Sequence, residues 1–183
     1  MVSHDLRTGM NFAGLSIGWS FCVYLAAVIA TAVLLHCLRR TPRFFSLVSL
    51  PGTIGHEFLH FLIGTLTLAK PVKVSLLPKF HRDGSATLGY VVFSNIRWYN
   101  ALWVGFAPLL ALPAALWMVY WRCAQIPPLQ WHELAWSYAA ASMAYSCLPS
   151  QADVEIVMSK PAGLLVYLGG ASMLCWVWFR MIA

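Results

Sequence analysis

Charged side chains are scarce in this sequence. Asp, Glu, Lys and Arg make up 10% of the 183 residues, and only six are acidic, whereas hydrophobic residues make up 60%. Soluble domains contain about 25% charged and about 45–50% apolar residues. The composition therefore excludes a disordered chain, a protein whose main partner is nucleic acid, and most soluble folds.

The cysteine pattern of a disulfide framework is also missing. The chain has five cysteines, none in a C-x-x-C pair, and most lie in or at the ends of long apolar runs. An odd number of cysteines in such positions does not fit a disulfide framework. We therefore expect buried thiols that act as small hydrophobic side chains.

Long runs without Asp, Glu, Lys or Arg are frequent. A run of about 18 such residues is long enough to cross a bilayer as a helix. We therefore expect an all-α multi-pass membrane protein that forms one integral-membrane domain over residues 1–183, with about five transmembrane helices. Their predicted ranges are roughly 18–38, 45–68, 98–121, 134–148 and 161–179.

The first run has an alternative interpretation as a signal peptide, because Ala30-Thr31-Ala32 resembles a cleavage site. The run continues through Leu35 and stops at Arg39-Arg40, which favours a retained span. The net charge of +6 fits basic loops that flank membrane spans. The expected location is the lipid bilayer, in the inner membrane of a bacterial cell.

The segment 70–97 follows a different pattern. Residues 72–76 alternate with period two, and residues 86–93 are rich in strand-forming side chains. Between them, Asp83-Gly84 accepts the positive φ of a tight turn. The pattern predicts one short β-hairpin between the second and third helices, with strands at about 72–78 and 86–93.

A strand at the edge of this hairpin offers free backbone N–H and C=O groups, to which an extended peptide can add. Val72, Val74 and Leu76 would share one face of the first strand. We therefore consider these three residues as candidate substrate-binding positions.

The motif His56-Glu57-Phe58-Leu59-His60 carries the chemistry. On a helix, positions i and i+4 share a face, so both imidazoles can bind one Zn²⁺. Zinc lowers the pKa of a bound water to about 7, and Glu57 can take its proton as general base. The alternative is a structural polar cluster between helices, but ionisable groups within a span destabilise it unless they are paired.

A catalytic zinc usually has three protein ligands and one open position. Pro149 breaks the fourth predicted helix, and Asp153 follows it. A broken helix at membrane depth is tolerated where it lines a polar cavity, so Asp153 is the predicted third ligand. Glu155 is the alternative ligand. Other acids and histidines lie near predicted membrane ends or in the hairpin turn, namely His36, His81, Asp83 and His132.

These features resemble the site-2-type intramembrane zinc metalloproteases over roughly residues 45–160. The resemblance implies that His56, His60 and Asp153 hold zinc and that Glu57 is the general base. Gly105-Phe106-Ala107-Pro108 is loosely similar to the family's Gly-Pro segment. Family chains often have an Asn after that segment; here Asn100 precedes it, and we consider it a further candidate substrate-binding residue.

The sequence thus predicts zinc-dependent hydrolysis of peptide bonds in membrane-protein substrates. Two alternatives remain open. One is a different membrane zinc peptidase in which Glu155 is the third ligand. The other is a non-enzymatic metal-binding membrane protein, which would need ligands but not the general base Glu57.

Overall fold

The computed structural model describes residues 10–12, 15–17, 19–81, 86–125 and 131–182. Most of these residues are helical, and the strands are short. In chain order the elements are β1 (Met10–Phe12), β2 (Leu15–Ile17), α1 (Trp19–Leu38), α2 (Pro42–Val48), α3 (Leu50–Leu66), β3 (Pro71–Ser75), β4 (Lys79–Phe80), β5 (Ala86–Thr87), β6 (Tyr90–Phe93), α4 (Ala101–Gly105), the 3₁₀ helix η1 (Ala107–Leu110), α5 (Ala111–Gln125), α6 (Trp131–Tyr145), α7 (Gln151–Met158) and α8 (Pro161–Ile182).

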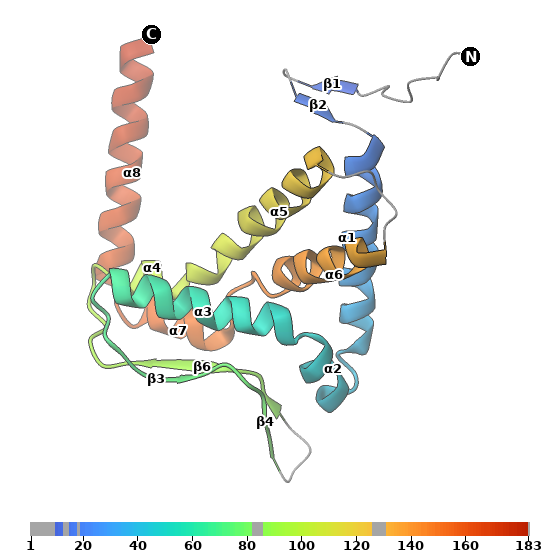
Figure 1. The fold of residues 1–183 in the computed structure, drawn as a ribbon. Helices are drawn as coiled ribbons and strands as arrows, with labels where there is room; N and C mark the ends of the chain where they lie inside the picture. The colour runs from blue at the N-terminus through green and yellow to red at the C-terminus, as the bar shows by residue number, and fades with distance from the viewer. Residues whose placement is uncertain (1–9, 13–14, 18, 82–85, 126–130, 183) are drawn as a thin grey trace.

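The long helices α1 and α8 lie at opposite edges of the molecule, and α3 crosses the space between them (Figure 1). The main hydrophobic core lies where α1, α5 and α6 meet. Its residues are mostly small, which lets the helices pack closely. They are Tyr24, Val28, Ala115, Val119, Ala140 and Ala141.

The predicted hairpin is present in a shorter form. β3 pairs with β6 in antiparallel register, with Val74 opposite Val91 and Ser75 opposite Tyr90, and β4 pairs with β5. The first strand therefore ends at Ser75, before the predicted residue 78. The proposed turn at Asp83-Gly84 lies outside the described residues.

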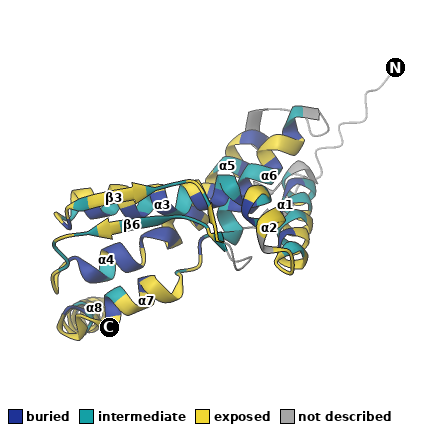
Figure 2. Cartoon of the chain, turned by 90° about the horizontal axis from the view of Figure 1, so that it is seen from below, coloured by how far each residue is buried: buried dark blue, intermediate teal, exposed yellow. Residues whose placement is uncertain are grey.

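The prediction of about five transmembrane helices is wrong. Among the described residues, only α1 and α8 contain a stretch long and apolar enough to cross a membrane. Neither behaves as the core helix of a soluble protein, because only 17% and 6% of their apolar windows are buried. Figure 2 views α8 nearly end-on, away from the region where α1, α5 and α6 meet, and most of its residues are exposed.

Prolines explain why the other predicted spans are broken. Proline has no N–H to donate and clashes with the preceding helical turn. The run 45–68 divides at Ser49 into α2 and α3, with Pro51 in the first turn of α3. The run 98–121 divides into α4, η1 and α5 around Pro108. α6 is continuous, but its 15 residues span only about 22 Å, less than the hydrocarbon core.

Gly52 allows the start of α3 to lie directly against α6. A Cβ atom at this position would overlap the Ser142 carbonyl and the Ser146 hydroxyl. The Gly52 N–H, which has no partner within its own helix, donates to Ser142 Oγ at 2.9 Å. This contact sets the distance between α3 and α6 beside the site described below.

Replacing Gly52 by Ala should therefore destabilise the fold by about 1–3 kcal/mol, the usual range for overpacking. Gly55→Ala is the matched control, because its Cβ would lie 3.7 Å from Met143 Cγ, an ordinary contact. Thermal unfolding of the purified protein in detergent should show a lower Tm for Gly52→Ala only. Equal Tm values for both variants would contradict this packing.

Candidate metal centre

Three side chains from two helices converge on one point. His56 and His60 come from α3, and Asp153 comes from the first turn of α7. The two Nε2 atoms lie 3.2 Å apart, and the Asp153 carboxylate oxygens lie 3.4 Å from His56 Nε2 and 2.9 Å from His60 Nε2. His60 and Asp153 are buried, and His56 is partly buried.

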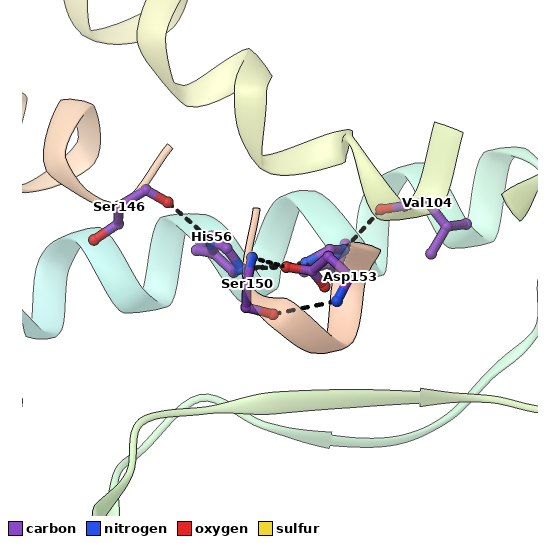
Figure 3. A network of polar contacts seen from close by, with 6 residues as sticks. His56, Val104, Ser146, Ser150 and Asp153 are labelled. Carbon is purple, nitrogen blue, oxygen red and sulfur yellow. Dashed lines mark hydrogen bonds and ion pairs between the residues drawn. The ribbon is translucent and has the colours of Figure 1, made fainter. Parts of the chain in front are cut away.

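Backbone carbonyls fix the orientation of both imidazoles (Figure 3). His56 Nδ1 donates to the Ser146 carbonyl at 2.7 Å, and His60 Nδ1 donates to the Val104 carbonyl at 2.9 Å. A carbonyl only accepts, so the hydrogen-bond network assigns a proton to each Nδ1. In the neutral rings, both Nε2 atoms therefore present lone pairs to the Asp153 carboxylate.

These two carbonyls are free for reasons that lie in the sequence. In a regular helix the Val104 carbonyl would accept from the N–H of residue 108, but that residue is proline and has no N–H. Ser146 lies just beyond the end of α6, where the carbonyls lack intrahelical partners. Each helix interruption therefore supplies one acceptor for a histidine.

A capping box holds Asp153 in place. Ser150 Oγ accepts from the Asp153 N–H at 3.3 Å, and the Ser150 N–H donates to Asp153 Oδ2 at 2.6 Å. Gly105 lets α7 approach α4, because a Cβ there would lie 2.7 Å from the Asp153 carbonyl oxygen. The Gly105–Pro108 segment thus serves both sides of the cluster: Gly105 makes room for Asp153, and Pro108 frees the acceptor of His60.

The cluster fits a tetrahedral zinc ion. Two ligand atoms on such an ion lie about 3.3 Å apart, given bonds of about 2.0–2.1 Å. The three separations of 2.9, 3.2 and 3.4 Å bracket this value. A single proton can bridge only two of the three acceptor atoms, whereas a metal cation can bind all three. The same donor set also accepts other first-row metal ions, so it fits zinc without being specific for it.

Glu57 lies beside the cluster and is buried, with 8% of its surface exposed. Among the described residues, its carboxylate has no hydrogen bond or ion pair. Gly89, just before β6, faces this side chain: a Cβ at Gly89 would lie 2.6 Å from Glu57 Cγ and 3.0 Å from Glu57 Oε1. The absence of a side chain at residue 89 leaves room for the carboxylate beneath the strand.

A cavity of ≈ 1040 Å³ opens onto the cluster and onto Glu57. Residues 88–91 and 93 form one wall, so β6 borders the cavity. Tyr90 in this wall accepts a hydrogen bond from Lys79 Nζ at 3.3 Å. Lys79 and then Lys73 lower the pKa of the Tyr90 hydroxyl below its usual value, since both cations favour the phenolate.

The other candidate residues lie elsewhere. Glu155 is exposed and accepts from Gln151. Asn100 is fully buried and bonds to the backbone of Arg97, Thr67 and Asn95, so it ties the end of α3 to the following loop. The cavity is bordered by β6 and not by β3, so its lining does not include Val72, Val74 or Leu76. His132 pairs with Glu133, and Asp83 lies outside the described residues.

No protein-family model matches the chain, and no curated protein or solved structure matches it either. The resemblance to site-2-type metalloproteases therefore stays a prediction from the residues.

The sequence did not predict the groups that support the candidate ligands and Glu57. It did not identify the carbonyls of Val104 and Ser146 as partners of the histidines, nor Gly89 as the neighbour of Glu57. One signal was present: Pro108 lies four residues after Val104 and predicts a free carbonyl there. Nothing in the sequence indicates that this carbonyl faces His60.

Asp153→Ala should remove most of the bound zinc, because it deletes one of the three converging ligands. Glu155→Ala removes a carboxylate from the same helix and should leave the metal content unchanged. Zinc analysis of the purified proteins checks this pair. Loss of metal from Glu155→Ala with retention in Asp153→Ala would mean that Glu155 is the third ligand.

Pro108→Ala should weaken metal binding although residue 108 is not one of the three candidate ligands. The new N–H competes with His60 for the Val104 carbonyl, and loss of such an outer partner typically lowers metal affinity by about 10–100-fold. Pro113→Ala, an exposed proline of α5, is the control. Competition with chelators of graded affinity measures the effect, and identical affinities in the two variants would refute it.

Proposed function

We propose that this protein is a zinc-dependent membrane peptidase that hydrolyses peptide bonds in membrane-protein substrates. The observation that carries the proposal is the pairing of two elements in one cavity. His56, His60 and Asp153 converge as a metal-ligand set, and the unpaired carboxylate of Glu57 lies next to them. A ligand set alone would serve metal storage equally well, whereas a carboxylate that lines the cavity beside the ligands and has no ion-pair partner among the described residues is suited to proton transfer.

Each residue has a defined task in this chemistry. Bound zinc supplies a Lewis acid that polarises a carbonyl group and acidifies water. Glu57 takes a proton from the attacking water and later gives a proton to the leaving amine, as the C–N bond breaks. The carbonyls of Ser146 and Val104 keep the two histidines in the tautomer that binds a metal.

Apolar surface supports a membrane location for this activity. Exposed large hydrophobic residues cover α8, among them Leu165, Leu174, Trp178 and Phe179. In water, an exposed patch of this kind would drive association. We propose that α1 and α8 anchor the protein in the bilayer and bring its site to membrane-embedded substrates.

Basic residues favour one orientation in a bacterial inner membrane. α1 ends, and α8 begins, on the side of the molecule that carries the hairpin (Figure 1). Arg39, Arg40 and Arg43 follow α1, and Lys160 precedes α8, whereas the far end of α8 carries Arg180. Cytoplasmic loops carry an excess of Lys and Arg, so this end should face the cytoplasm.

The strand beside the cavity suggests how a substrate is held. A transmembrane helix must unwind before its peptide bond can be attacked, and its freed backbone groups then need partners. The described part of the β3–β6 sheet has two strands, so β6 keeps an unpaired edge. An extended substrate segment can pair with such an edge.

Glu57→Gln tests the proposal directly, since it removes the base and preserves size and polarity. The variant should keep its zinc but lose about 10²–10⁴-fold in hydrolysis, the usual contribution of a general base. The measurement is cleavage of a transmembrane peptide library in liposomes, followed by mass spectrometry, beside zinc analysis of the same samples.

A matched control is Glu155→Gln, which makes the same chemical change at an exposed site and should cleave at the wild-type rate. Full activity in Glu57→Gln would end the peptidase proposal. Stable zinc binding without cleavage of any peptide by the wild-type protein would instead favour the non-enzymatic alternative.

A further inference from the structure

The cavity at the metal centre extends well beyond it and ends at a cationic group. Its wall along α1 contains Leu25, Val28, Ile29 and Ala32, and it finishes with His36 and Arg39. The spacing of these residues places them on one face of the helix. From Leu25 to His36 the helix axis rises about 16 Å, the length of about five extended peptide residues.

Arg39 is the only Lys or Arg that lines this cavity within the described part of the chain. No described carboxylate lies within ion-pair distance of it. Of the two acids in the cavity wall, Asp153 belongs to the metal-ligand set and Glu57 lies beneath Gly89. The guanidinium is therefore available to a ligand.

Few residues separate the cationic end of the cavity from the metal centre. The His36 ring contacts the edge of Tyr145, with ring centroids 6.5 Å apart, and Tyr145 also packs on Phe45. The next residue, Ser146, supplies the carbonyl that binds His56. An occupant that reaches Arg39 can therefore also reach the catalytic end of the same cavity.

We propose that Arg39, with His36 beside it, is a specificity site for a carboxylate on the substrate, which is either an acidic side chain or a free C-terminus. The apolar face of α1 would contact the hydrophobic part of the same peptide segment. An arginine pairs with a carboxylate through two parallel N–H···O bonds, which gives both attraction and orientation. This inference rests on the proposed peptidase function and defines the chemistry of its substrate.

Arg40 provides a matched control. It is the next residue, carries the same charge and lines a separate outer cavity with His36, Cys37 and Arg39, but it does not line the cavity of the metal centre. A general attraction between the basic end of α1 and an acidic peptide would depend on both arginines. A specific site in the catalytic cavity would depend on Arg39 alone.

The experiment measures binding in full-length Glu57→Gln protein in detergent, which holds peptide without cleaving it. The probes are fluorescent apolar peptides in two matched pairs, one with a single Glu or Gln and one with a C-terminal acid or amide. We expect the carboxylate member of at least one pair to bind about tenfold more tightly, as for one charge-assisted hydrogen bond. The pair that discriminates identifies the source of the carboxylate.

Adding Arg39→Gln should abolish this discrimination, and adding Arg40→Gln should preserve it. Unchanged zinc content shows that the Arg39→Gln protein is folded, and Arg39→Glu should reverse the preference toward a Lys-bearing peptide. Equal effects of the two arginine variants, or no discrimination, would overturn the proposal. So would loss of anionic-lipid binding in Arg39→Gln with peptide discrimination intact, because Arg39 would then bind lipid phosphate.

Failure of the proposed function gives a different result from failure of this inference. The binding comparison uses a variant that does not cleave, so it does not depend on turnover. Absence of cleavage by the wild-type protein, with Arg39-dependent discrimination intact, would contradict the peptidase proposal alone.

Discussion

The convergence of three electron-pair donors in a buried space is the constraint on which the rest of the structure depends. The Nε2 atoms of His56 and His60 face each other, and the Asp153 carboxylate faces both. Such an arrangement is repulsive unless a positive charge lies among the three groups. The protein holds this geometry by hydrogen bonds to both histidines and to the aspartate, so each ligand has its own outer support.

Breaks in the helices make that support available. Pro108 frees the Val104 carbonyl, and the end of α6 frees the Ser146 carbonyl. The same interruptions divide long apolar runs into short helices. The cavity is therefore bordered by α1, α3, α5, α6, α7 and β6, and these helices do not form a regular bundle of spans. Glycines at 52, 89 and 105 then allow backbones to approach where the site needs them.

Local sequence signals indicated which three side chains converge, but they did not indicate the fold around them. The i, i+4 spacing of His56 and His60 places both imidazoles on one face of α3. Pro149-Ser150 indicates the start of α7, and Asp153 lies in the first turn of that helix. Those signals depend on neighbouring residues. The five-span prediction is wrong because the long apolar runs are interrupted near Pro51 and Pro108, and because α6 is too short to cross the hydrocarbon core. The contact between Gly89 and Glu57 joins distant segments, and no local pattern encodes it.

X-ray absorption at the zinc K-edge of the purified wild-type protein tests the central claim most directly. Two imidazole nitrogens and a carboxylate oxygen should appear at about 2.0–2.2 Å in a four-coordinate site. The Asp153→Ala protein should lose this signal. A sulfur ligand at about 2.3 Å, or a protein that binds no zinc at all, would contradict the account.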